Sequence, residues 1–133
     1  MRHHVVLLLV LALAACRTKS HDRPDLGAQI TAANSSQYCH SPDACFNPQI
    51  LVLENGYDVT IFAGNNPRHT MLRTEALREY LMGLPMSAWP RGPIIEITPT
   101  DVVTDSHSVE KNVEQARRIC RSLRLDVQFR PGG

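Results

Sequence analysis

An apolar run near the N-terminus determines which residues of this chain are available to form the folded domain. The run extends from Val5 to Ala15, and a short segment carrying Arg2 precedes it. A basic start, about ten apolar residues and small residues at the end are typical of a secretory signal peptide. The run is shorter than the roughly 20 residues that a membrane-spanning helix needs. The sequence therefore predicts that residues 1–15 are a signal peptide, which is removed on export and takes no part in the fold.

The last residues of the run form the tetrapeptide Leu13-Ala14-Ala15-Cys16. It resembles, position for position, the lipobox of bacterial lipoproteins. The resemblance implies cleavage before Cys16, a diacylglycerol on its sulfur and an acyl chain on the new amino terminus. One acyl chain alone binds a bilayer only marginally, whereas several chains hold a protein there stably. The expected partner is thus the lipid bilayer, reached through the Cys16 lipid.

The residue after the lipobox bears on location. In the sorting rule of enteric-type lipoproteins, Asp at this position retains the protein at the inner membrane, and this chain has Arg17. The resemblance therefore implies the outer membrane, on its periplasmic or surface side. Ala12-Leu13-Ala14 also fits the A-x-A site of ordinary signal peptidase. Cleavage there would give a secreted, soluble, disulfide-stabilised protein, and this alternative stays open.

Composition excludes some functions. A chain of 133 residues is expected to form one domain. Removal of residues 1–15 takes away Arg2 and leaves 13 basic and 13 acidic side chains. Balanced charge argues against nucleic-acid binding, and an aromatic content of 5% disfavours a stacking surface for bases. No motif for a cofactor is found, so none is expected.

Residues 16–47 have the composition of a tether. Their first part is polar and lacks the periodicity of a helix or strand, which is typical of a disordered segment. Asn34-Ser35-Ser36 matches a glycosylation sequon, and in a bacterial lipoprotein we interpret it as a polar loop. The sequence predicts a lipidated flexible arm over residues 16–47 and a small α/β domain over residues 48–130.

Three cysteines remain after Cys16. Export would place them in an oxidising compartment, where paired cysteines form disulfides. Cys39 and Cys45 enclose a turn-forming stretch, and we predict a disulfide between them. A metal site with Cys39, His40 and Cys45 is the weaker alternative, because it lacks the close ligand pairs of structural zinc sites. Cys120 falls on an apolar helix stripe and is predicted to be a buried free thiol.

Strand and helix patterns alternate in the domain. Residues 50–53 and 57–63 predict two strands, with Asn55-Gly56 indicating a type I′ hairpin turn between them. Asn66-Pro67 predicts the start of a helix that ends at Gly83. The proline-rich residues 82–93 predict an irregular loop in which Trp89 packs rather than binds a ligand. Residues 94–98 predict a further strand.

The C-terminal third repeats the alternation. An apolar stripe predicts an amphipathic helix, and the last strand follows it over residues 125–129. The stripe consists of Val109, Val113, Ala116, Cys120 and Leu123. The predicted fold class is α+β, with the order strand-strand-helix-strand-helix-strand. The economical arrangement is two layers, one sheet with two helices on one face.

This order is similar in pattern to the periplasmic domain of the ExbD/TolR proteins, which work in energy-transducing envelope complexes. Ile95 to Asp101, the helix that follows and Val127 to Phe129 carry the similarity. Members of that family have an N-terminal transmembrane helix with a proton-carrying Asp, and this chain has a lipobox instead. The resemblance therefore implies only a small envelope-binding domain, without proton-driven work.

Two functions follow from the side chains. Arg117, Arg118, Arg121 and Arg124 form a basic patch that could contact an acidic envelope protein or an anionic polymer. Its alternative is a solvated helix face. Asp105 and His107, with Asp101, Thr104 and Ser106 nearby, could form the site of a small periplasmic hydrolase, although such residues are also common helix caps. We expect a binding or structural lipoprotein without catalytic or metal-ligating residues. His69 is expected to be a surface residue.

Overall fold

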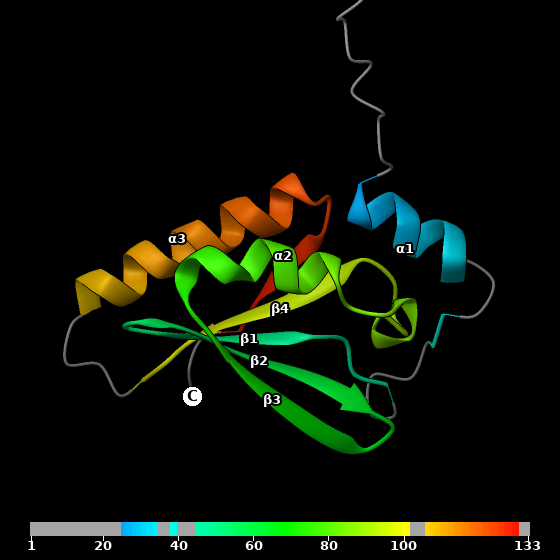
Figure 1. Cartoon of the computed structure of the whole chain (residues 1–133), viewed down its shortest axis with the longest axis horizontal. Helices are drawn as coiled ribbons and strands as arrows, with labels where there is room; N and C mark the ends of the chain where they lie inside the picture. Colours follow the sequence, from blue (N-terminus) through cyan, green and yellow to red (C-terminus); the bar gives the residue numbers. More distant parts are fainter. Residues whose placement is uncertain (1–24, 35–37, 40–44, 102–105, 131–133) are drawn as a thin grey trace, which may run out of the picture.

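The computed structural model of the chain describes residues 25–34, 38–39, 45–101 and 106–130. These residues form a five-stranded mixed sheet with three α-helices packed on one face, as Figure 1 shows. The predicted α+β class and the one-sided arrangement are therefore confirmed. The α-helices are α1 (Leu26–Asn34), α2 (Leu77–Met82) and α3 (Ser106–Ser122), and the strands are β1 (Gln49–Leu53), β2 (Gly56–Ala63), β3 (Asn66–Leu72), β4 (Ile94–Pro99) and β5 (Asp126–Phe129).

The strands lie in the order β3-β2-β1-β4-β5. Strands β1, β2 and β3 form an antiparallel meander, while β4 is parallel to β1 and β5 is parallel to β4. The helix α3 connects β4 to β5, so these two neighbours have the parallel relation expected for strands joined through a helix. Consequently β3 and β5 are the two edges of the sheet.

The β1–β2 hairpin is present, but its turn is not of type I′. Leu53 pairs with Gly56, so the central residues are Glu54 and Asn55, and neither has the positive φ that a type I′ turn requires. Gly56 instead begins β2, where a Cβ would collide with the carbonyl oxygen of Leu72. Glycine is needed here for a close approach of two strands rather than for the turn.

The prediction of a helix that begins at Asn66-Pro67 is wrong for its first half, because residues 66–72 form β3. Gly64, with φ 63°, and Asn65 make a two-residue turn that returns the chain antiparallel to β2. Pro67 lacks an amide hydrogen and is tolerated because β3 is an edge strand. Helical structure starts only with the short 3₁₀ helix η1 (Thr74–Ala76) and continues in α2, which ends at Gly83 as predicted.

A helix also occupies part of the expected tether. Residues 26–34 form α1, with Leu26 and Ile30 buried in the core. The amide of Gly27 donates a hydrogen bond of 2.9 Å to the carbonyl oxygen of Leu123, just after α3. The expectation of an unstructured segment therefore fails for these nine residues, and the fold begins well before residue 48.

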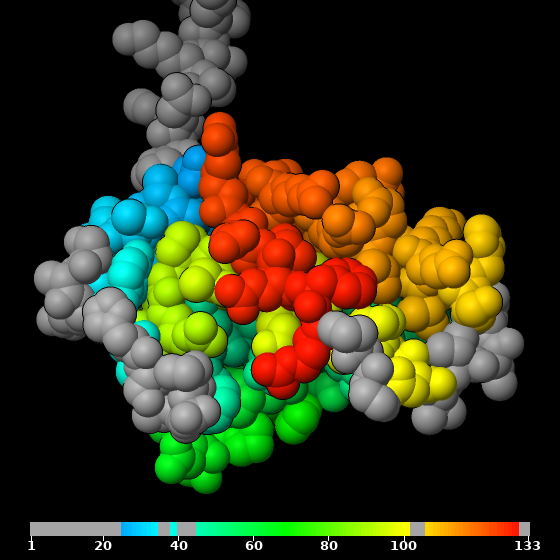
Figure 2. Space-filling model, turned by 180° about the vertical axis from the view of Figure 1, so that it is seen from behind, coloured from blue at the N-terminus to red at the C-terminus, as the bar shows by residue number. Residues whose placement is uncertain are grey.

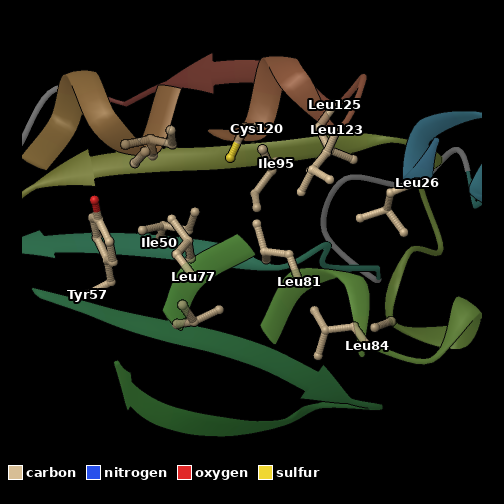
Figure 3. Close-up of a cluster of buried hydrophobic side chains, with 14 of the residues drawn as sticks. Leu26, Ile50, Tyr57, Leu77, Leu81, Leu84, Ile95, Cys120, Leu123 and Leu125 are labelled. Atoms are coloured by element: carbon tan, nitrogen blue, oxygen red, sulfur yellow. The ribbon is translucent and has the colours of Figure 1, made fainter. Parts of the chain in front are cut away.

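The core lies between the helices and the sheet, as Figure 3 shows. Strand residues that alternate along β1, β2 and β4 point toward the helices, as expected for a half-buried sheet. Burying each large aliphatic side chain contributes about 1.5–3 kcal/mol. The fully buried members include Ile50, Val52, Tyr57, Val59, Leu77, Leu81, Ile95, Ile97, Ala116 and Cys120.

A polar residue replaces one position of the predicted α3 stripe. Asn112 is buried, whereas Val113 is only half-buried at the edge of the core. The Asn112 Nδ2 donates to the carbonyl oxygens of Leu53 (2.8 Å) and Glu54 (3.0 Å). The side chain of Asn112 thereby binds the β1–β2 turn to α3, a role that apolar periodicity does not reveal.

The proline-rich loop is held against the segment that follows the disulfide. The predicted disulfide joins Cys39 to Cys45, and the Cys39 amide donates to the Pro90 carbonyl at 2.8 Å. Asn47, 7% exposed, donates through Nδ2 to the carbonyls of Gly92 and Ile94 and accepts at Oδ1 from the amide of Arg91. Trp89 is fully buried, which confirms a packing role.

Candidate functional site

The second half of α3 and the strand β5 together form a shallow hollow at one edge of the sheet. Arg117 and Arg121, one helical turn apart, line it from α3, and Val127 and Phe129 line it from β5. Its volume is about 140 Å³. Figure 2 shows β5, in red, exposed beside α3, in orange. The hollow therefore combines two guanidinium groups with an apolar floor.

The end of α3 fixes this geometry. Arg124 has φ 59°, and its amide donates to Arg121 O while the Leu125 amide donates to Cys120 O, both at 3.0 Å. This is a Schellman motif, which ends a helix through one residue in the left-handed region. The chain then reverses at once into β5, so β5 runs directly beneath the arginines of α3.

Only two of the four predicted arginines line the hollow. Arg118 is exposed elsewhere on α3. Arg124 lies in the turn, where its Nε is 3.5 Å from Asp25 Oδ2 at the start of α1. The expected patch of Arg117, Arg118, Arg121 and Arg124 is thus divided by the helix, and Arg117 and Arg121 form the half that lines the hollow.

The charges of the hollow are weakly compensated. Among the described residues, Arg117 pairs with Glu114, whose Oε2 lies 3.8 Å from Nη1, and both side chains are substantially exposed. Such a pair contributes little in water. For Arg121, no ion pair is found within the part of the chain that the structure describes. A negatively charged ligand would therefore meet two guanidinium groups without displacing a strong internal partner.

Phe129 gives the hollow its apolar character. Its side chain is 49% exposed, and the Arg117 guanidinium carbon lies 5.8 Å from the ring centroid. This distance allows a cation–π contact, which orients the guanidinium over the ring. An exposed aromatic side chain next to arginine is a composition that protein-binding surfaces favour. From the sequence, Val127 and Phe129 are predicted only to belong to a strand, because their position beside α3 depends on the topology.

The alternative hydrolase site is not assembled by the described residues. Thr104 and Asp105 lie outside them, while Asp101 is exposed after β4. His107 is exposed in the first turn of α3, and Arg121 lies 14 residues further on. At 1.5 Å per residue, about 20 Å of helix separates His107 from the hollow. Among the described residues, His107 and the arginines of the hollow therefore do not share a site.

A second polar cluster lies on the open face of the sheet. The Nδ1 of His69 is 3.2 Å from Asp58 Oδ2 and 3.1 Å from Thr60 Oγ1. Both partners meet the same ring nitrogen, whereas a catalytic triad uses both nitrogens of its histidine. His69 is 58% exposed, as expected for a surface residue. The arrangement orients an exposed imidazole by cross-strand contacts and does not provide an activated nucleophile.

The structure also argues against the alternative of a metal site at Cys39, His40 and Cys45. The sulfurs of Cys39 and Cys45 are bonded to each other and cannot act as thiolate ligands, and His40 lies outside the described residues. Within the described ranges, no group of three or more His, Cys, Asp or Glu side chains is placed to hold a metal ion. Cys120 is free and buried, and burial raises the pKa of its thiol to about 12.

Comparisons with protein families, with characterised proteins and with solved structures find no match to this chain. None of the helices that the structure describes is long and apolar enough to cross a bilayer.

Proposed function

We propose that this protein is a lipid-anchored protein of the bacterial cell envelope, and that its domain binds an acidic partner protein through the hollow beneath Arg117 and Arg121. The observation that carries the binding role is the hollow itself. Two arginines with weak internal compensation face an exposed aromatic ring there. Arginine suits such a role because its planar guanidinium forms paired hydrogen bonds with carboxylates.

Two features of the chain support the location. The lipobox at Leu13 to Cys16 provides a site for the lipid. The Cys39–Cys45 disulfide supports an exported protein, because disulfides persist mainly in oxidising compartments. The pattern similarity to ExbD/TolR domains also supports a location in the cell envelope, but it does not suggest an activity.

The anchor is tested by mass spectrometry of the membrane fraction. Cys16 should be the modified N-terminus, and Cys16→Ser should yield a protein without the lipid. A mature soluble chain that begins at Ala15 would contradict lipidation and favour the secreted form.

The binding role is tested by cross-linking in cells. A photo-reactive amino acid in place of Phe129 should capture a protein, whereas the same group in place of Met71, which is 65% exposed on β3, should not capture that protein. The product should disappear in Arg117→Gln/Arg121→Gln and persist in Arg118→Gln. Equal capture from both positions, or capture that does not depend on these arginines, would contradict the proposal.

A further inference from the structure

The outer edge of β5 carries backbone groups that point away from the sheet. The amides of Asp126 and Arg130 donate toward β4, to Pro93 O at 2.7 Å and Ile97 O at 3.1 Å. Backbone groups alternate in direction along a strand, so the N–H and C=O of Val127 and Phe129 face outward. Since β5 ends the sheet, they meet no neighbouring strand within the described chain. A row of such groups is a template for another strand.

The side chains of the same two residues face the helices. Val127 and Phe129 pair in register with Ile95 and Ile97, which are fully buried beneath the helices. Paired residues of adjacent strands point to the same face of a sheet. Residues of an added strand that lie opposite Val127 and Phe129 would therefore point to the α3 side, where Arg117 and Arg121 line the hollow. The outward backbone groups and the two arginines thus belong to one continuous surface.

From this continuity, and resting on the binding role proposed above, we infer that β5 accepts an extended acidic segment of a partner protein as a further strand. The segment would exchange backbone hydrogen bonds with Val127 and Phe129. Its acidic side chains would all point to the α3 face, where they would reach Arg117 and Arg121 beside the Phe129 ring, and its aliphatic side chains would point to the opposite face of the sheet. Backbone bonds give affinity in this mode of recognition, and the side chains on one face give specificity.

Charge favours an acidic partner over a second copy of the chain. Antiparallel pairing of two β5 strands about a two-fold axis would place both α3 helices on the same face, with their arginines toward each other. Such like charges at an interface are unfavourable. The opposite edge is less suited, because Pro67 of β3 has no amide to donate. The acidic segment is therefore the occupant that fits β5.

The test uses residues 17–133 and fluorescent peptides of roughly six residues, a usual strand length. One peptide alternates Glu with Val, and a matched peptide has Gln in place of Glu. Two further versions of the acidic peptide carry N-methyl groups on alternate amides, in the two opposite phases. One phase removes the donors that face β5, whereas the other removes only donors that face solvent.

Fluorescence anisotropy should show binding of the acidic peptide and of one methylated phase only. The Gln peptide and the Arg121→Gln protein should each raise Kd about tenfold, as expected for loss of a charge-assisted hydrogen bond. Arg118→Gln should leave Kd unchanged. Hydrogen exchange should show slower exchange of the Val127 and Phe129 amides in the complex.

Any result other than a split between the two methylated phases would overturn strand addition. Binding of the protein to phosphatidylglycerol vesicles, without binding of the acidic peptide, would overturn it in favour of a membrane surface. If the cross-link at Phe129 depends on Arg121 but the phases do not differ, this inference fails while the proposed function stands. If the cross-link is independent of Arg121, the proposed function fails.

Discussion

The hydroxyl of Tyr57 donates a hydrogen bond of 3.0 Å to the carbonyl oxygen of Asn112, joining the start of β2 to the middle of α3. Together with the side-chain bonds of Asn112, this contact gives the helix a polar attachment inside an apolar layer. Buried polar groups with all partners satisfied fix one arrangement of the elements. The contact therefore sets where α3, and with it the hollow, lies along the sheet.

Asn112→Leu should destabilise the protein by about 2 kcal/mol, because two carbonyl oxygens of the β1–β2 turn lose their donor. Tyr57→Phe should cost about 1 kcal/mol, since it removes one bond and keeps the ring. Urea unfolding measures both changes. Gln115→Leu is the control, because its bond to Thr74 O is long at 3.4 Å, and its effect should be under about 0.5 kcal/mol. A neutral Asn112→Leu would show that α3 is positioned by apolar contacts alone.

Gly27→Ala should detach α1 from the domain. A Cβ at Gly27 would collide with the carbonyl oxygen of Arg124, which is backbone and cannot move independently. Hydrogen exchange should show loss of protection over residues 26–34, while β1 and β4 stay protected. Gly83→Ala is the matched control, because its Cβ would meet nothing closer than 3.5 Å. Full protection of α1 in Gly27→Ala would contradict the docking of this helix.

Arg124→Gly should raise stability by up to about 1 kcal/mol. The left-handed conformation at φ 59° costs a non-glycine residue about 1–2 kcal/mol, and glycine adopts it freely. The exposed contact of Arg124 with Asp25 offsets only part of this gain. Arg118→Gly, inside α3, should instead destabilise by about 1 kcal/mol. Thermal melts that move in the same direction for both variants would contradict the Schellman geometry.

Alkaline pH should destabilise the fold through Cys120. Burial raises the pKa of this thiol to about 12, whereas an unfolded thiol has a pKa of about 8.5. The thiol contribution is thus complete below about pH 8.5 and is lost as the pH rises toward 12, with a slope of up to about 1.4 kcal/mol per pH unit. In Cys120→Ala the decline should begin later, near pH 10, where Tyr57 titrates in the unfolded chain.

Urea melts between about pH 7 and pH 10 compare the two proteins. For Tyr57, burial first and then the nearby Cys120 raise the pKa to about 12, so both proteins lose stability above the ordinary tyrosine pKa. Only between the pKa values of cysteine and tyrosine in the unfolded chain, about 8.5 and about 10, does the difference between the two proteins report on the Cys120 thiol alone. Identical pH profiles there would show that Cys120 is hydrated in the folded protein.

The periodicity of apolar residues predicts most of the strands and α3. Local sequence signals fail where the secondary structure depends on contacts with distant parts of the chain. Asn66-Pro67 has the composition of a helix start, yet the two-residue turn at Gly64 and the exposed edge beside β2 make the same residues a strand. For α1, only Leu26 and Ile30 enter the core, and two apolar residues give too weak a pattern to predict a helix. The local sequence of Gly27 likewise does not show that it approaches Arg124, 97 positions later.

Of the candidate site, the sequence predicts the arginines of α3 but not the residues of β5. The arginines of α3 were recognisable as a basic patch, but their division by the helix depends on where the stripe is buried. Val127 and Phe129 were assigned to a strand because they alternate with polar residues, and that pattern does not reveal an edge. Neither the order of the strands nor the exposure of β5 follows from local sequence, so the hollow emerges only in three dimensions.

The docking of α1 shortens the linker between the lipid and the domain in the proposed anchored form. With residues 16–47 extended, the folded domain could move far from the bilayer, but the fold already begins at Asp25 and Leu26. About nine residues then separate the lipid from the first docked residue, and at roughly 3.5 Å each they reach at most about 30 Å. Because Gly27 contacts the turn between α3 and β5, the start of α1 lies close to the start of β5. A partner segment would therefore have to approach within a narrow layer above the headgroups, so that the same short connection limits which envelope proteins can present a strand to it.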